Sequence, residues 1–268
     1  MKISQKYHHI VNELTPFVYA YEENVKEFDL NAFSSSKVIQ FSPFKHEDLE
    51  FFNLLKVLDK NSFQESGMGM DNWVFLDCAI MPSAIIGFAI HSSKASLEIL
   101  ETYNIDKSYN GFIPLSMFIA IPMVRKGYWF AHNLSSSNSF LKDKLKGLGL
   151  LTKAMGIKIL KIKNLMGATQ WGNHSLKVHT RLAKLKLESA HTPIHSHPDS
   201  IIYSCEFHPG DIENALTKKG QSVSNHKIDI NDKDAIVDLN ERVKSEDVYI
   251  VTGAVIEGKK SYVYLLDV

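Results

Sequence analysis

The chain has 268 residues, 44% of them hydrophobic, and its 30 Lys and Arg residues balance 30 Asp and Glu residues, so its formal net charge is zero. This length suits one large domain, or a domain of about 150 residues with a second module. A balanced charge gives no global attraction to nucleic acid or to an anionic membrane surface, and we expect neither as a partner.

No apolar segment reaches the roughly 18 residues that a spanning helix needs. The longest candidate, residues 111–123, carries two prolines and stops before Arg125. Residues 1–9 contain no apolar core of the signal-peptide type. Cys78 and Cys205 each lie in an apolar stretch, which predicts buried thiols of a reducing compartment instead of a disulfide. We therefore expect a soluble cytoplasmic protein.

The N-terminal residues predict a short helix at 9–14, an aromatic stretch at 17–21 and a serine-rich break at 34–36. We interpret residues 1–36 as an N-terminal extension packed on the main domain. A short strand is expected next, at residues 37–41.

A helix follows at residues 46–58, because positions 49, 52, 55 and 58 are apolar and share one helical face. Residues 73–80 and 83–90 have the composition of two strands, and Met81–Pro82 between them predicts a hairpin. The further elements before residue 135 are a helix at 95–103 and strands at 111–124 and 127–134, with the prolines interrupting the first of these strands.

The second half of the chain alternates helices and strands. We expect helices up to residue 163 and at 174–184, 211–218 and 233–243, and strands at 166–171, 185–190, 200–207, 227–230, 248–256 and 261–266. This mixed order predicts an α/β or α+β layered fold with a partly antiparallel sheet.

A glycine-rich turn, Lys144–Leu–Lys–Gly147–Leu–Gly149, opens directly into an apolar run of helical spacing. Such a turn at a helix N-terminus presents unpaired backbone N–H groups and the positive end of the helix dipole, which together bind anions such as phosphate. A Cβ at either glycine would keep a diphosphate from approaching the backbone. A plain turn is the alternative. No Lys–Ser/Thr pair closes a P-loop, and Thr152 replaces the third glycine of a dinucleotide fingerprint.

Lysines crowd this turn and its helix, at positions 142, 144, 146, 153, 158, 161 and 163, with Asp143 as the only acid among them. Lys144 and Lys146 lie in the turn itself, so they are candidates for phosphate contact. Lys158, Lys161 and Lys163 are expected on a solvated helix face.

A second motif lies about 25 residues further on, where a predicted strand reads Ala168–Thr–Gln–Trp–Gly–Asn173 and a helix follows. Asn173 can cap that helix. Together with the turn, the order of strand, Gly-x-Gly turn, helix, strand, Asn, helix and strand resembles the GCN5-related N-acetyltransferases (GNAT). In that family the turn is written Gln/Arg-x-x-Gly-x-Gly/Ala, and Lys144 here replaces the Gln or Arg. The 168–173 segment is also similar to bacterial acyltransferases of nucleotide-linked amino-deoxysugars, such as dTDP-fucosamine acetyltransferases.

The resemblance covers residues 37–208 and implies a GNAT acyltransferase domain with a central mixed, mostly antiparallel sheet. Residues 209–268 would form a C-terminal α/β module without a motif of its own. The implied activity moves a short acyl group, acetyl or hydroxyacyl, from acyl-coenzyme A to the amine of a dTDP-linked amino-deoxyhexose. The product would enter surface polysaccharide such as lipopolysaccharide O-antigen. The implied partners are these small molecules and a homo-oligomeric copy, and acyl-CoA serves as co-substrate without a metal.

The resemblance also assigns binding residues for coenzyme A. The backbone of the turn would hold the pyrophosphate, and Asn173 would hold the pantetheine arm or the sugar. The resulting set is Lys144, Leu145, Lys146, Gly147, Leu148, Gly149, Leu150 and Asn173.

The chemistry requires a base, or a path of water molecules, that deprotonates the attacking ammonium, and a histidine suits the role of base near neutral pH. His132, at the end of the strand before the turn, is the first candidate. The family often places a Tyr seven residues after the Asn to protonate the thiolate, whereas this chain has Thr180 there, preceded by His179. Either His179 substitutes for the Tyr or another group, such as water, protonates the thiolate.

The candidate substrate-binding residues are Tyr128, Trp129, Asn133 and His195. Tyr128 and Trp129 could form an aromatic wall for a sugar or a nucleobase, with core packing as the alternative. His195 belongs to a cluster with His191 and His197 that suggests a metal site, but no fourth ligand is evident and two prolines mark a loop. We expect this loop to line the substrate site. A loop at 67–72 could close over substrate or serve as a plain connection.

Two rival functions remain open. One is an acyltransferase that acts on an amino acid or another small amine. The other is a non-catalytic sensor of acyl-CoA, in which Thr180 and Lys144 mark a degraded site. The intact glycine pair favours retained coenzyme A binding.

Overall fold

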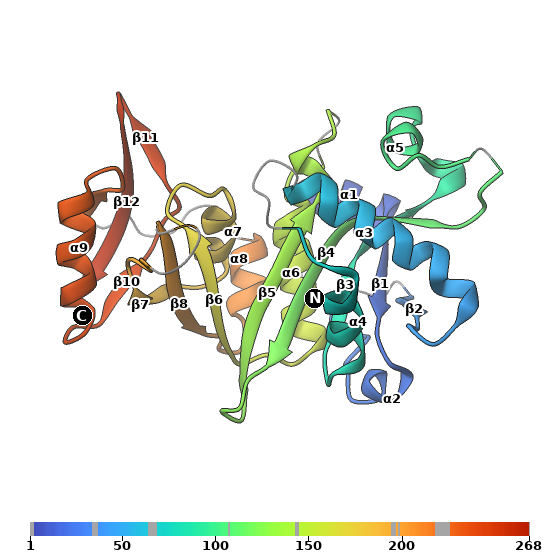
Figure 1. Ribbon diagram of the computed structural model, residues 1–268, viewed down its shortest axis with the longest axis horizontal. Coiled ribbons are helices and arrows are strands. Elements are labelled where there is room, and N and C mark those ends of the chain that lie inside the picture. Colours follow the sequence, from blue (N-terminus) through green and yellow to red (C-terminus); the bar gives the residue numbers. More distant parts are fainter. Residues whose placement is uncertain are drawn as a thin grey trace. The chain divides into compact units, whose positions relative to one another are not determined.

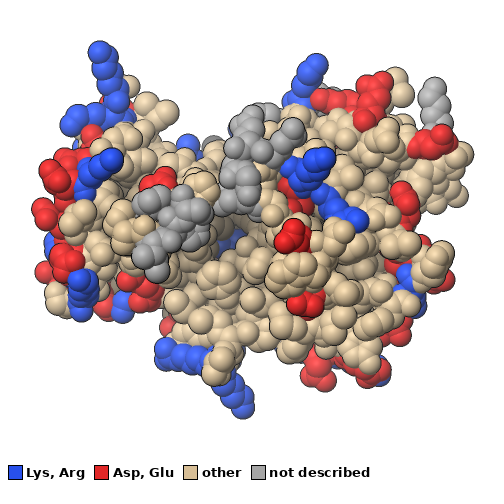
Figure 2. All heavy atoms as spheres, viewed as in Figure 1, with Lys and Arg blue, Asp and Glu red and all other residues tan. Residues whose placement is uncertain are grey.

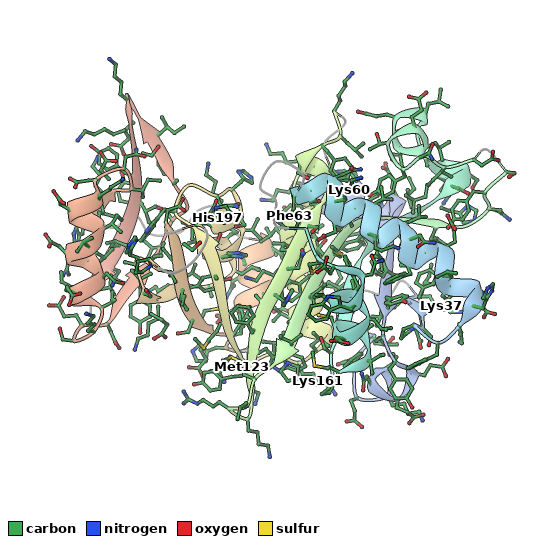
Figure 3. The ribbon with its side chains drawn as sticks, viewed as in Figure 1. Lys37, Lys60, Phe63, Met123, Lys161 and His197 are labelled. Atoms are coloured by element: carbon green, nitrogen blue, oxygen red, sulfur yellow. The ribbon has the colours of Figure 1, made fainter. Side chains whose placement is uncertain are left out.

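The computed structural model describes residues 3–33, 37–63, 69–106, 108–142, 145–193, 197, 199–217 and 226–267, and Figure 1 shows the elements. Its contacts divide the chain into two compact units. Unit 1 comprises Met1–Met123 and His132–Ile162, and unit 2 comprises Val124–Ala131 and Lys163–Val268. Figure 3 labels Met123, where the chain first leaves unit 1. Strand β5 (Tyr128–Ser136) begins in unit 2 and ends in unit 1.

Unit 1 is built on a mixed sheet with the strand order β2 (Ile39–Phe41), β1 (Thr15–Tyr19), β3 (Ala84–His91), β4 (Phe112–Pro122). β1 runs parallel to β2 and antiparallel to β3, and β3 and β4 are antiparallel. β1, β3 and β4 are almost continuously buried, as expected for strands with helices on both faces.

The helices of unit 1 are α1 (His8–Glu13), α2 (Glu22–Val25), α3 (Leu49–Phe63), α4 (Asn72–Ile80), α5 (Leu97–Thr102) and α6 (Leu148–Ile159). Its short 3-10 turns are Gln5–Tyr7, His46–Asp48, Ser92–Lys94 and Ser137–Ser139. α3 and α6 both pack on β4, with α3 in front of the sheet and α6 behind it in Figure 1.

Residues 73–80 are a helix and not the predicted strand, so no hairpin forms around Met81. Phe75, Cys78 and Ala79 are buried, whereas Trp73 is exposed. This spacing of three and four residues is helical, and the short apolar run had concealed it. The outward side of this helix is also hydrophobic, so the segment lacks the polar face that marks an amphipathic helix.

The aromatic stretch near the N-terminus contributes β1, which lies between β2 and β3 in the sheet of unit 1. Phe17 and Val18 are fully buried. Residues 15–19 of the predicted N-terminal extension are thus part of the sheet of unit 1.

β4 is one continuous strand that contains both prolines predicted to interrupt it. The register shifts where Phe88 pairs with Ser116 and Ala89 with Pro114. Leu115 is therefore the extra residue of a β-bulge, placed beside a proline that has no N–H to donate to the ladder.

Unit 2 contains a second run of paired strands, in the order β5, β6, β8, β7, β10, β12, β11, with β9 also paired to β12. The bounds are β6 (Asn164–Gln170), β7 (Leu185–Ser189), β8 (Ser200–Glu206), β9 (His226–Asp229), β10 (Val248–Ile250), β11 (Val255–Glu257) and β12 (Lys260–Asp267). The helices are α7 (Ser175–Leu182), α8 (Asp211–Thr217) and α9 (Lys233–Arg242).

Most pairs in unit 2 are antiparallel, and β5 with β6 is the parallel exception. β10 pairs with β7, which joins the C-terminal strands to the sheet that contains β6 and β8. The strand predicted at 248–256 is divided into β10 and β11. The predicted layered α/β class with a mixed, mostly antiparallel sheet is confirmed.

Both cysteines are buried free thiols, as predicted. Burial raises the pKa of the Cys78 thiol to about 11, so it remains protonated near neutral pH. Charged side chains of both signs are interspersed on the face seen in Figure 2. None of the helices that the structure describes is long and apolar enough to cross a membrane.

Candidate functional site

The glycine turn has the predicted position at the start of α6, and Gly147 is its N-cap residue with φ of +97°. The Leu148 N–H donates to the Leu145 carbonyl (2.9 Å) and the Leu151 N–H donates to the Gly147 carbonyl (3.0 Å). Glycine adopts this left-handed conformation without the penalty that a side chain incurs. A Cβ at Gly147 would also overlap the ring of Tyr7. Gly147 is thus required by the fold, and Tyr7 occupies the side that we had expected a diphosphate to approach.

Asn138 holds the turn in place through both atoms of its side-chain amide. Its Nδ2 donates to the Leu145 carbonyl and its Oδ1 accepts from the Leu145 N–H, each at 2.8 Å. Asn138 was not among the residues predicted for the site. An Asn within a serine-rich loop, just before a glycine turn, is a signal that could have found it.

The first turn of α6 presents free backbone donors. Among the described residues, no acceptor pairs with the N–H groups of Lys146, Gly147, Gly149 and Leu150. A Cβ added at Gly149 would meet only the Ser136 Cβ, at 4.0 Å, so this side of the turn is open. Lys146 is exposed beside it. Two of the predicted amides, those of Leu145 and Leu148, are bonded within the protein instead. Unpaired N–H groups at the start of a helix such as the 12-residue α6 are donors that favour anions.

Buried polar groups fix α6 against the sheet. The Thr152 hydroxyl lies 2.6 Å from Ser116 Oγ on β4 and 2.8 Å from the Leu148 carbonyl. Lys153 is 1% exposed, so it is not a solvated lysine. Of the lysines predicted on a solvated helix face, Lys158 is on α6 and partly exposed, whereas Lys161 and Lys163 are exposed but lie beyond the end of the helix. The helix that carries the free amides is therefore anchored to β4 over its first two turns.

His132 lies in the part of β5 that belongs to unit 1, and its side chain is exposed. Desolvation lowers its pKa below the ordinary value of 6.5. The lowered pKa therefore comes from partial desolvation by neighbouring protein atoms, since the ring itself is not fully enclosed. The imidazole is therefore neutral near pH 7 and can accept a proton.

Asn133, the next residue of β5, is buried and its amide is already engaged. Its Nδ2 donates to Asp59 Oδ1 (2.9 Å), and its Oδ1 accepts from Ser135 Oγ (2.7 Å). Asp59 Oδ2 accepts from the Met70 N–H (2.7 Å). These contacts tie the loop before α4 to β5, and they give Asn133 a positioning role in place of the expected substrate contact.

Asp59 is only 2% exposed, and burial raises its pKa although its two hydrogen bonds oppose the shift. It lies on α3 next to Lys60, which Figure 3 labels. Asp59 was not predicted for the site, because an acid that follows a run of apolar helix positions carries no signal of burial.

The candidate residues on α7 have structural partners within unit 2. Asn173 Oδ1 accepts from the Ser175 N–H (2.8 Å), which confirms its capping role. His179 is 6% exposed and its ring lies against that of Tyr203, with centroids 5.2 Å apart. Thr180 is also buried, and its hydroxyl donates to the Leu176 carbonyl (2.8 Å). Thr180 thus has no proton directed toward solvent.

Tyr128 and Trp129 lie in the part of β5 that belongs to unit 2, and both are partly exposed. The Arg125 guanidinium lies over the Tyr128 ring, 3.9 Å from its centroid. The pairing of β5 with β6 ends at Ala131 and Gly167, although β5 continues to Ser136.

Lys144 and His195 lie outside the described residues, and so do residues 67 and 68 of the loop at 67–72. Among the residues with described placement, no group of three or more His, Cys, Asp or Glu side chains could hold a metal ion.

No protein-family model matches the sequence, and no curated protein matches it. Among solved structures, the chain is similar to the ribosomal-protein-S18-alanine N-acetyltransferase from Escherichia coli, with 9% identity, a TM-score of 0.40 and coverage of 68% of this chain and 96% of that one. It is similar to the NatC complex bound to Gag peptide and CoA, with 13% identity, a TM-score of 0.42 and coverage of 62% and 96%. It is also similar to a GNAT-family acetyltransferase from Bacillus anthracis, with 11% identity, a TM-score of 0.37 and coverage of 61% and 91%.

Proposed function

We propose that the protein is a GNAT-type N-acyltransferase that uses acyl-coenzyme A. The observation that carries this proposal is the start of α6, where no acceptor among the described residues pairs with the N–H groups of Gly149 and Leu150, and where a Cβ at Gly149 would meet only the Ser136 Cβ of those residues. Coenzyme A brings a diphosphate, which is a doubly charged acceptor of such hydrogen bonds. The exposed ammonium of Lys146 adds a positive charge at the same turn.

The proposed reaction is direct attack of an amine on the thioester carbonyl. The N–C bond forms, the C–S bond breaks, and the coenzyme A thiolate leaves. His132 would take the proton from the amine, because its ring is neutral near pH 7 and accessible. A backbone N–H of β5 beyond Ala131, where pairing with β6 has ended, would polarise the carbonyl.

The thiolate must also gain a proton, and the described contacts exclude two candidate proton donors. The Thr180 hydroxyl is buried and bonded to its own helix. His179 is buried against Tyr203. Water, or the proton that His132 has taken up, is therefore the proposed source.

The acceptor that we propose is a dTDP-linked amino-deoxyhexose, acylated for surface polysaccharide. Its support is the resemblance of the segment from Ala168 to Asn173 to sugar acyltransferases. The acyl group would be short. An amino acid or another small amine is the second candidate acceptor.

A charge placed on the open side of the turn tests the coenzyme A site. Gly149→Asp puts a carboxylate in the first turn of α6, where the helix dipole favours it, so the melting temperature should not fall. The affinity for coenzyme A, measured by calorimetry, should fall at least tenfold, because the carboxylate repels the diphosphate. Gly149→Ala is the uncharged control. An unchanged affinity in Gly149→Asp would remove α6 from the proposed mechanism.

A matched pair of charge reversals tests Lys146. Lys146→Glu should weaken coenzyme A binding, whereas Lys233→Glu, an equal change at the start of α9, should not. Equal losses in both variants would indicate a general charge effect.

Release of free thiol from acetyl-CoA separates an enzyme from a sensor. We expect release to require an amine, and to be fastest with a dTDP-linked amino sugar. Coenzyme A binding without release for any amine would favour the sensor.

A further inference from the structure

A cavity of about 470 Å³ lies within unit 1, between β1, the loop after β2, α3 and α4. Its walls include the aromatic side chains of Phe44, Phe52 and Trp73. Phe44 and Trp73 are 62% and 64% exposed, respectively. Cavities of this size and composition bind small molecules with flat apolar faces.

Tyr19 forms part of the cavity wall, where its hydroxyl is available to a ligand. The residue is 3% exposed, and its ring stacks on Phe52 with centroids 6.0 Å apart. Among the described residues, its hydroxyl has no hydrogen-bond partner and is not one of the enclosed unpaired polar atoms, so it is open to the cavity that Tyr19 lines. Burial and the nearby Asp48 raise the pKa of Tyr19, so the hydroxyl keeps its proton.

The other polar groups of the cavity wall are Lys45, His46 and Asn72, and none of the described residues that line it is a carboxylate. Lys45 is paired with Glu22 (2.9 Å), so its charge is partly balanced. The cavity therefore offers aromatic surface, hydrogen-bond donors and an amide. These groups suit a planar ring with acceptor atoms on its edge.

We propose that this cavity binds the base of a nucleotide, with the ring against the aromatic walls and an edge acceptor on the Tyr19 hydroxyl. The inference rests on the proposed function and deepens it: the base is that of the nucleotide-linked acceptor. The adenine of coenzyme A has the same chemistry, so the test includes both sources.

Covalent and hydrogen-bonded connections join the cavity to β5, the strand that carries the proposed base, His132. Phe52 and Asp59 are seven positions apart on α3, about 10 Å along the axis and on the same helical face. Asp59 contacts Asn133, the neighbour of His132, and the Met70 N–H. Met70 in turn precedes Asn72 and Trp73 of the cavity wall by two and three residues. The cavity and the strand β5 are therefore held together within unit 1.

The experiment titrates the full chain with dTDP, UDP and 3′-phospho-ADP, with affinity measured by calorimetry. Wild-type protein should bind dTDP. Tyr19→Phe should weaken dTDP about tenfold through loss of one hydrogen bond, without a lower melting temperature, because no protein partner is lost. Trp73→Ala should weaken it at least tenfold by removal of a stacking surface, and folding should persist because Trp73 is exposed.

Tyr103→Phe is the matched control. The Tyr103 hydroxyl donates to the Pro114 carbonyl, so this variant should lower the melting temperature and leave dTDP affinity unchanged. The proposal is overturned if dTDP does not bind, or if Tyr19→Phe and Trp73→Ala bind it as wild type does. It is also overturned if only 3′-phospho-ADP loses affinity in these variants, because the base would then be that of coenzyme A.

Coenzyme A binding is measured in parallel with wild type and Gly149→Asp. If coenzyme A binds and dTDP does not, the cavity assignment fails while the acyltransferase stands. If dTDP binds through Tyr19 and coenzyme A does not bind at all, the acyltransferase fails instead.

Discussion

At the residue scale, Gly147 and Gly149 of the same turn differ in backbone conformation and in the space beside them. Gly147 has a positive φ and faces the Tyr7 ring, whereas Gly149 has ordinary helical geometry and an open side. Gly147→Ala should therefore lower the free energy of unfolding by at least about 1 kcal/mol. Gly149→Ala should raise it by up to about 1 kcal/mol, because alanine favours the helix. Chemical denaturation measures both.

A double variant separates the two penalties at Gly147. Tyr7→Ala should relieve the steric part but not the backbone part, so Gly147→Ala should cost less in the Tyr7→Ala background and still cost something. Equal costs in both backgrounds would contradict the ring contact.

His132 should determine the acid side of the activity profile. Because its pKa lies below 6.5, kcat/KM should fall only as the pH drops below that value. His132→Gln should reduce the rate about 100-fold or more and abolish the acid limb, with coenzyme A affinity retained. His9→Gln, at an exposed position of α1, is the control. A variant that keeps the acid limb would exclude His132 as the base.

The lowered pKa of His132 also predicts the direction in which the unfolding free energy changes with pH. The unfolded ring binds a proton near pH 6.5, whereas the folded ring binds it only at lower pH. The unfolding free energy should therefore decrease as the pH falls from 6.5 to the folded pKa, and then remain level with respect to this group.

Some of the candidate site was accessible from sequence because its signals are local. The glycine turn, His132 and the capping Asn173 are defined by neighbours within a few residues. Asp59 and Tyr7 were not accessible, because their partners, Asn133 and Gly147, are 74 and 140 positions away. No spacing rule predicts such contacts.

At the scale of the elements, the turn before α6 is held by one side chain, that of Asn138. Asn138→Ala removes both hydrogen bonds to Leu145, so unfolding free energy should fall by about 1–3 kcal/mol and coenzyme A affinity should also fall. Asn138→Asp keeps the acceptor for the Leu145 N–H but loses the donor, so its losses should be intermediate. Calorimetry and denaturation test both. An Asn138→Ala variant with wild-type affinity would show that the turn needs no such support.

Element type was predictable where the apolar pattern was long and clear, as for α3, α6 and α9. It was wrong at residues 73–80, because the outward face of α4 is also apolar and the helical period is lost. The placement of β1 inside the sheet of unit 1 was not predictable either. Its partners are residues 39–41 and 85–89, and pairing over such separations leaves no trace in local composition.

Strand β5 connects the two units at the scale of the whole molecule. Its first residues pair with β6 in unit 2, and its remainder from His132 belongs to unit 1. The sequence between the two parts of unit 1 is thus a strand segment of unit 2. No single cut of the chain separates the units, so each must be perturbed from within.

A pair of glycine substitutions offers that perturbation. A Cβ at Gly87 would overlap the Ser116 carbonyl and the Phe17 ring in unit 1, and a Cβ at Gly167 would meet the Tyr203 hydroxyl at 2.5 Å in unit 2. Gly87→Ala should accelerate amide exchange in β1, β3 and β4, and Gly167→Ala should do so in β6, β7 and β8. Hydrogen exchange with mass spectrometry resolves these strands. If either variant accelerates exchange equally in both sets, the units unfold as one cooperative body, and a single melting temperature then describes the whole chain.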